Sequence, residues 1–242
     1  MTDGWLFLLR WFHFLAGITW IGMLYYFNFV QVPFFAGADA PVRTGMITGG
    51  LVSRALWWFR WGAMLTFITG WLYLLHRIGQ LGGVQSFFST PYGWSIFIGG
   101  ILGTLMWFNV WFIIWPAQQV VMASATRVKE GGQAIPEAAA RGARGGAASR
   151  TNTMLSIPML FFMGAASHFP GLFSPTARGM KVAMMIVFAI ILVIVEGNAV
   201  VGPATPDKAS AGKKLLSTVK GTLWAGFVLT AIFVIALKII FA

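Results

Sequence analysis

Three histidines are the residues of this chain best suited to ligate a metal or a haem iron. They are His13, His76 and His168, and each stands within or beside an apolar run. Ionisable groups in hydrocarbon are costly, so each needs a partner or a function. Because imidazole nitrogens ligate haem iron and transition metals, we expect His13 and His168 to be the ligands of a metal centre, with His76 as a reserve.

Each histidine also has a structural interpretation. His13 could be a neutral imidazole that donates to a backbone carbonyl of a neighbouring helix, or it could relay protons. His76, next to Arg77, could be solvated at the membrane interface, and His168 could cap a helix end. Arg10 shares a helix face with His13, one turn away. Its charge could extend to the outer surface or neutralise a haem propionate.

A second polar set lies toward the opposite ends of the apolar runs. Glu196 is the only acidic residue within such a run. It could pair with a basic residue at the membrane boundary, transfer protons, or bind a substrate. Side-chain amides offer paired donors and acceptors that can recognise a small polar heterocycle. The candidate catalytic residues are therefore Asn109, Gln118, Asn152 and Glu196.

The composition indicates an integral membrane protein. The 242 residues are 58% hydrophobic and 10% charged, whereas soluble domains carry about 25% charged residues. The chain has no cysteine, which excludes disulfides, iron–sulfur clusters and covalent haem attachment. Any haem would therefore be a non-covalent haem b. The net charge of +11 is concentrated in alternate loops, so it indicates membrane topology rather than nucleic-acid binding.

Apolar runs close to the length of a membrane span predict the architecture. We predict an all-α integral membrane protein with a single domain over residues 1–242 and a bundle of about six transmembrane helices. The first run has no cleavage site before it, so we expect a retained helix rather than a signal peptide. The predicted spans are 5–32, 57–75, 92–115, 154–169, 182–201 and 223–241, with a cytoplasmic loop over 118–150.

The distribution of lysine and arginine orients this bundle. Twelve of the 17 basic residues fall in the loops after the first, third and fifth spans or at the adjoining helix ends. The positive-inside rule therefore places both termini outside, which is the periplasm in a Gram-negative bacterium. We expect a multi-pass protein of the bacterial inner membrane. All three histidines then lie in the outer half of the bilayer or at its edge.

Several sequence blocks together carry a resemblance to a known family. They are Arg10-Trp11-Phe12-His13 with Trp20-Ile21-Gly22, Trp58-Phe59-Arg60-Trp61, Asn109 to Gln118, Asn152 to Pro158, and Ser167-His168-Phe169-Pro170. These blocks resemble the membrane domain of the PuuD-type, membrane-bound urate hydroxylases, also called urate oxidases. The resemblance implies a membrane redox protein that oxidises urate and passes electrons to a cytochrome c and a terminal oxidase.

The chain departs from the family pattern in four respects. It has no cytochrome c motif, and it lacks a pair of helices between the second and third predicted spans. Phe97 and Thr151 stand where family histidines are expected, and Gly62 stands where the family has an acidic residue. His13 and His168 match. We interpret the chain as a shortened relative that keeps the scaffold.

From these features we expect a membrane redox subunit that binds haem b and passes electrons to a separate periplasmic cytochrome c or a terminal oxidase. An enzymatic version would oxidise urate or another purine on the cytoplasmic side. The alternative is a cofactor-free accessory subunit of a larger membrane complex, in which the histidines are structural. In every case the expected partners are the lipid bilayer and other membrane subunits, not nucleic acid.

Overall fold

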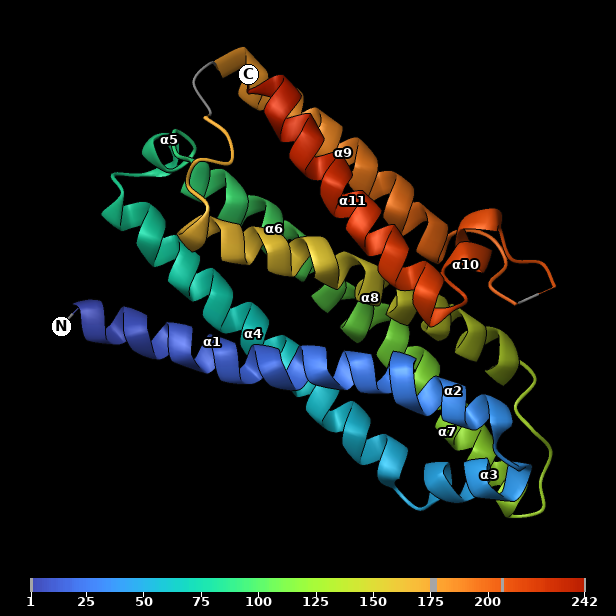
Figure 1. The fold of residues 1–242 in the computed structure, drawn as a ribbon. Coiled ribbons are helices and arrows are strands. Elements are labelled where there is room, and N and C mark those ends of the chain that lie inside the picture. The colour runs from blue at the N-terminus through green and yellow to red at the C-terminus, as the bar shows by residue number, and fades with distance from the viewer. Residues whose placement is uncertain (1, 175–177, 206, 242) are drawn as a thin grey trace.

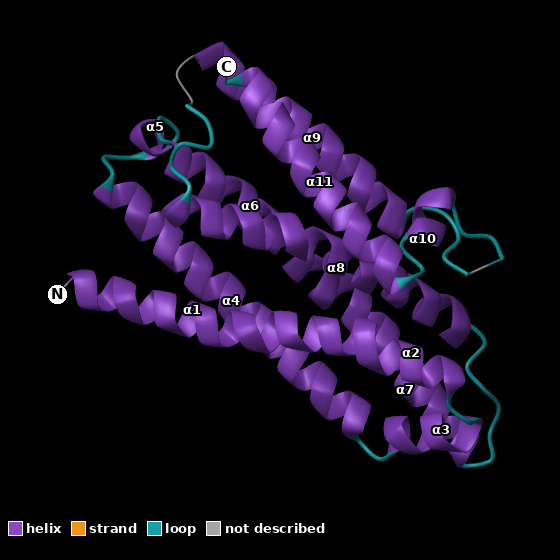
Figure 2. Ribbon diagram, viewed as in Figure 1, coloured by secondary structure: helices purple, strands orange, loops and turns teal. Residues whose placement is uncertain are grey.

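The computed structural model describes residues 2–174, 178–205 and 207–241, which form helices joined by loops (Figures 1 and 2). No strand occurs among these residues, so the predicted all-α class is confirmed. The long helices are α1 (Thr2–Tyr25), α4 (Leu51–Gln80), α6 (Pro91–Phe108), α7 (Trp115–Lys129), α8 (Ala138–His168), α9 (Arg178–Val200) and α11 (Val219–Ile240). The short ones are α2 (Val32–Gly37), α3 (Ala40–Thr48), α5 (Val84–Phe87) and α10 (Ala211–Leu215), with two π-helices, η1 (Tyr26–Gln31) and η2 (Asn109–Ile114).

Four helical stretches in the described part of the chain are long and apolar enough to cross a membrane. They coincide with the first, third, fifth and sixth predicted spans, so the chain has the helices of a membrane protein. The second and fourth predicted spans fall on α4 and α8, which carry more polar residues, and their crossing stays a prediction. The four stretches are Gly4–Gly37, Pro91–Lys129, Met180–Val200 and Val219–Ile240.

Helix α8 lies at the centre of the bundle. It contacts α1, α6, α7, α9 and α11, while α1 packs along α4 and α9 packs along α11 (Figure 1). On α6 a buried face recurs every four residues, as one side of a helix must. Leu155 and Phe162 of α8 are fully buried in the same core. The large apolar residues of this α6 face are Trp94, Ile98, Leu102 and Met106.

Glycines let some of these helices approach one another closely. A Cβ atom on Gly62 of α4 would lie 3.1 Å from the backbone nitrogen of Trp20 in α1. A Cβ atom on Gly226 of α11 would lie 2.8 Å from the carbonyl oxygen of Met154 in α8. Small residues commonly allow such contacts between membrane helices. The backbone of α1 therefore occupies the space that an acidic side chain at Gly62 would need.

Two prolines account for the two π-helices. Pro33 and Pro116 each stand two residues after the end of a π-helix, η1 and η2 respectively. A proline has no N–H to donate, and its ring clashes with the carbonyl four residues earlier. Widening the preceding turn relieves that clash while the chain stays helical.

The predicted cytoplasmic loop 118–150 is mostly helical. Residues up to Lys129 extend α7, as expected, whereas Ala138 already begins α8. The alanine-rich stretch 138–148 therefore forms part of a helix, in keeping with the helix propensity of alanine. Only residues 130–137 of this segment lie outside helices.

Candidate functional site

A cavity of about 430 Å³ lies between α1, α4, α6 and α8. Most of its wall is apolar, and five glycines contribute to the lining. A wall without side chains leaves flat surfaces that suit a planar ligand. The glycines are Gly17, Gly22, Gly70, Gly100 and Gly103, and the polar lining residues include Arg10, His13, Thr66, Tyr73, Tyr92, Thr104 and Ser167.

His13 is held in this cavity by α4. Its Nδ1 atom lies 2.9 Å from the carbonyl oxygen of Thr66 and 3.3 Å from the hydroxyl of Thr69. A carbonyl oxygen can only accept, so Nδ1 carries the proton and donates it. The ring packs against Gly70, where an added Cβ atom would lie 2.8 Å from Cε1. No described residue hydrogen-bonds to Nε2.

The hydrogen bond to Thr66 is the one that the structural interpretation of His13 predicts. It is also the bond that a metal-ligating histidine makes with its second nitrogen, because that bond fixes the tautomer and the ring orientation. The geometry is therefore compatible with both interpretations, and Nε2 is the atom available to a ligand.

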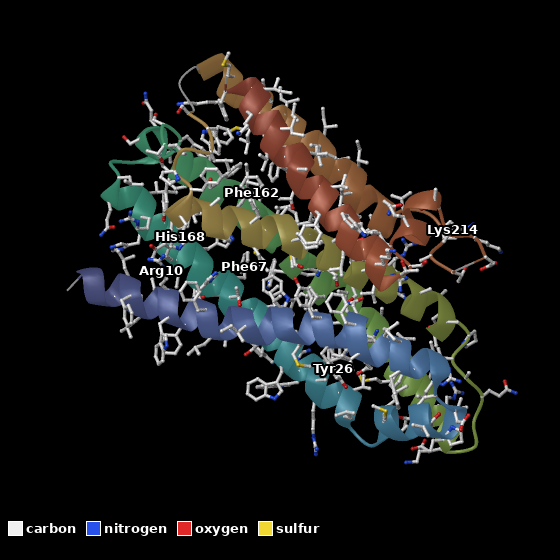
Figure 3. The ribbon with its side chains drawn as sticks, viewed as in Figure 1. Arg10, Tyr26, Phe67, Phe162, His168 and Lys214 are labelled. Carbon is white, nitrogen blue, oxygen red and sulfur yellow. The ribbon has the colours of Figure 1, made fainter. Side chains whose placement is uncertain are left out.

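The other predicted cofactor residues are divided between the cavity and its surroundings. Arg10 lines the cavity, whereas His76 and His168 do not. His168 is exposed at the end of α8, directly after the lining residue Ser167, and Figure 3 shows it at the same end of the bundle as Arg10. Across the described part of the chain, no group of three or more His, Asp or Glu side chains could hold a metal ion.

The sequence reasoning did not include several residues of the cavity wall. Trp71 of α4 donates to the hydroxyl of Thr104 of α6 at 3.0 Å, which ties the two helices together. Tyr92 lies beneath the guanidinium of Arg77, whose Cζ atom is 5.6 Å from the ring centre. The polar residues at helical spacing on α4 were the available signal, but their spacing alone does not say which partner helix they meet.

The predicted amide and carboxyl residues form a second site, which we call the amide–carboxyl cluster: Asn109, Asn152 and Glu196. Asn109 Nδ2 donates to Asn152 Oδ1 at 2.9 Å and to Glu196 Oε2 at 3.1 Å. Asn152 Nδ2 donates to the carbonyl oxygen of Met106 at 2.9 Å. Both asparagines are 0% exposed. Three helical segments, η2, α8 and α9, thus bring three of the four predicted residues together.

Gln118 does not join this cluster. It lies in α7, half-buried, on the side of the helix that meets Gly145 of α8. Glu196 also forms no ion pair with a basic side chain among the described residues, so the ion-pair interpretation of this carboxyl is not supported.

A polar face of α8 connects the cluster to α1. Asn28 of η1 donates to the hydroxyl of Ser149 at 2.8 Å. The hydroxyls of Tyr25 and Ser156 lie 2.8 Å apart. Ser149, Asn152 and Ser156 recur at spacings of three and four residues, so they share one side of the helix. Neither serine was predicted to be a site residue, because serine is common in helices that carry no functional site.

The two positions where family histidines are expected hold side chains that pack within the bundle. Phe97 lies within an aromatic group, with ring centres 5.1 Å from Phe88 and 6.3 Å from Phe188. Thr151 is 1% exposed, and its hydroxyl has no hydrogen-bond partner among the described residues. Neither residue lines the cavity that contains His13.

Comparison with known families supports the resemblance seen in the sequence blocks. Residues 82–198 match the family described as urate oxidase N-terminal, so the resemblance is confirmed over that stretch. The match includes the amide–carboxyl cluster, Gln118 and His168, and it begins after Arg10, His13 and His76. No curated protein and no solved structure matches the chain.

Proposed function

We propose that this chain, whose residues 82–198 match the urate oxidase N-terminal family, is a haem b-binding redox subunit of the bacterial inner membrane. The observation that carries the proposal is His13, whose Nδ1 is anchored on Thr66 while its ring lines a cavity of about 430 Å³. When bound, haem b would supply one-electron chemistry and link a donor to a separate cytochrome c or a terminal oxidase.

The residues of the cavity fit this group. His13 Nε2 would hold the haem iron, with the Thr66 carbonyl holding the ring in place. The glycine-lined walls leave room for a flat macrocycle, and Arg10 at the cavity would neutralise a propionate. We also propose His168 as a second ligand, with His76 in reserve. Their support is weaker, because neither side chain lines the cavity.

We propose six crossings with both termini in the periplasm. This topology adds α4 and α8 to the four apolar stretches. Its support is the packing of α4 along α1 and the central place of α8 among membrane helices. The exposed apolar side chains on α9 and α11 would face lipid or another membrane subunit.

A second candidate function is oxidation of urate or another purine by the residues Asn109, Gln118, Asn152 and Glu196. The observation that favours it is the burial of both asparagines within the stretch that matches the family. We rank it second, because none of these residues lines the cavity.

Haem titration of the purified protein tests the first proposal. We expect a Soret band on reconstitution with haem b, and we expect His13→Ala to lose it. Thr19→Ala, on the same helix but outside the cavity lining, should keep the band. His168→Ala should alter the spectrum if that residue is a ligand. The absence of a Soret band in the wild-type protein would favour a cofactor-free accessory subunit. Urate loss in the presence of added cytochrome c tests the second candidate.

A further inference from the structure

Two buried oxygen atoms in the amide–carboxyl cluster lack a hydrogen-bond partner among the described residues. They are Asn109 Oδ1 and Glu196 Oε1. Both belong to the two side chains that the bond from Asn109 Nδ2 to Glu196 Oε2 already joins. Buried polar atoms are nearly always hydrogen-bonded, so two unpaired atoms on one interacting pair require an explanation.

The orientation of the Asn109 amide is fixed by its neighbours. The carbonyl of Met106 can only accept, so the group that Asn152 turns toward it must be its amide nitrogen. Asn152 therefore presents its side-chain oxygen to Asn109, so the group of Asn109 that faces it must be the amide nitrogen, which donates the hydrogen bond. The unpaired oxygen of Asn109 thus follows from a backbone group rather than from a free choice of amide orientation.

One proton on Glu196 supplies what both atoms lack. An ionised carboxylate and an amide oxygen are both acceptors, so neither can donate a hydrogen bond to the other. A carboxylic acid has one O–H donor in addition to its accepting oxygen. An acid and a primary amide are therefore complementary, with N–H donating to one carboxyl oxygen and O–H donating to the amide oxygen.

We infer that Glu196 and Asn109 form a proton-binding site within the membrane, in which the protonated Glu196 carboxyl donates a hydrogen bond to Asn109 Oδ1. Loading the site takes one proton from water and forms one O–H bond on Glu196, and no electron moves. By the topology proposed above, the exchange is with the cytoplasmic side. Glu196 is only partly buried and stands one turn before the end of α9, so water can reach it.

The surrounding charges leave this carboxyl without a counter-ion. From α8, Arg144 donates to the carbonyls of Ala199 and Gly202. From α10, Lys213 donates to the carbonyls of Val201 and Gly202. The described residues of α6 and η2 include no charged side chain.

The remaining cations of the packed helices are also directed elsewhere. Arg150 of α8 lines a separate pocket with Asn28 and Thr218. The other lysine and arginine side chains of these helices are exposed, namely Arg141 of α8, Lys214 of α10, and Lys220 and Lys238 of α11. Since an ionised carboxyl in hydrocarbon needs a partner, the bound proton takes the place of a cation.

Infrared spectroscopy of the haem-free protein in liposomes tests this inference. At pH 7 we expect the carbonyl stretch of a protonated carboxylic acid, and we expect Glu196→Gln to abolish it. Glu130→Gln, which changes an exposed glutamate in the 130–137 loop, should leave that band unchanged. Asn109→Ala should keep the band but move it to higher frequency, because the acid loses its acceptor.

Several outcomes would overturn the inference. One is a wild-type spectrum at pH 7 without an acid band, and another is a band that persists in Glu196→Gln. A carboxylate band that responds to added sodium would indicate a metal cation in place of the proton. If Glu196→Gln fails to fold, two other results decide the question: the loss of the wild-type acid band as the pH is raised above 7, and the shift of that band in Asn109→Ala. Because no sample contains haem, failure here is separate from failure of the haem proposal.

Discussion

Two of the candidate site residues take their orientation from backbone carbonyls of neighbouring helices. His13 donates Nδ1–H to Thr66, and Asn152 donates to Met106. Since a carbonyl can only accept, each of these bonds decides which side-chain atom is left over. In the cavity the remaining atom is an imidazole nitrogen suited to iron. In the amide–carboxyl cluster it is an amide oxygen that needs a donor.

Gly70→Ala is a test of how His13 is positioned. The added Cβ atom would lie 2.8 Å from His13 Cε1 and 3.1 Å from Nδ1, so the ring must move from the Thr66 carbonyl. Disturbing the outer hydrogen bond of a ligand typically weakens binding by about 10–100-fold, and we expect that loss in haem affinity measured by titration. Gly79→Ala on the same helix meets nothing within 4 Å and should bind as the wild type does. Equal affinities in the two variants would contradict the positioning role.

Residue types and depth predicted part of the candidate site. Asn109, Asn152 and Glu196 were grouped from their position near one membrane boundary, and they do meet. Gln118 was grouped with them on the same grounds, but it lies nine residues beyond Asn109, about 13 Å further along a helix. Depth also says nothing about which way a side chain faces, which is why His168, expected in the same half of the bilayer as His13, does not line its cavity.

At the scale of elements, the end of α9 is closed by two cations from other helices. Arg144 of α8 donates to the carbonyl of Ala199 at 2.9 Å, and Lys213 of α10 donates to the carbonyl of Val201. Positive groups suit the negative end of a helix dipole. Burial, and then the charge of Arg144, lower the pKa of Lys213. The carbonyl oxygens thus hold together two cations that repel each other.

Arg144→Ala should destabilise this junction. The change removes the donor of the Ala199 carbonyl and one of the two donors of the Gly202 carbonyl. Hydrogen bonds from a charged group contribute about 1.5–3 kcal/mol each at most. We expect a lower melting temperature in detergent, equivalent to roughly 2 kcal/mol. Arg141→Ala, an exposed residue one turn earlier on α8, is the matched control and should melt with the wild type. If the two variants lose the same stability, Arg144 does not cap α9.

The sequence predicted the elements better than their details. Apolar length located the helices, and the alanine-rich stretch 138–148 proved helical because alanine favours a helix even outside the membrane. The π-helices before Pro33 and Pro116 were not predicted, because an apolar sequence has the same hydropathy whether it forms a π-helix or an α-helix. Close approaches such as that of Gly62 to α1 depend on tertiary packing and leave no local signal.

At the scale of the whole molecule, the number of crossings decides which side of the membrane the segments after α4 and α7 face. Four helical stretches are apolar enough to span by themselves. Helices α4 and α8 turn part of their polar residues toward other helices, as α4 does with Thr66 and α8 with Asn152 and Ser156. A central helix surrounded by others can cross a membrane with a composition that a lipid-facing helix could not have.

Single cysteines distinguish six crossings from four, because the chain has none of its own. With both termini outside, six crossings place Gln85 in the periplasm and Gln133 in the cytoplasm, whereas four crossings exchange the two. Asp207 is cytoplasmic in both arrangements. We therefore expect a membrane-impermeant thiol reagent to label Gln85→Cys in intact spheroplasts, and to label Gln133→Cys and Asp207→Cys only after lysis. Labelling of Gln133→Cys before lysis, with Gln85→Cys protected, would leave α4 and α8 outside the set of crossings. The proton-binding site would stay on the cytoplasmic side in that case, since Glu196 must lie on the same side of the membrane as Asp207, in the loop after α9.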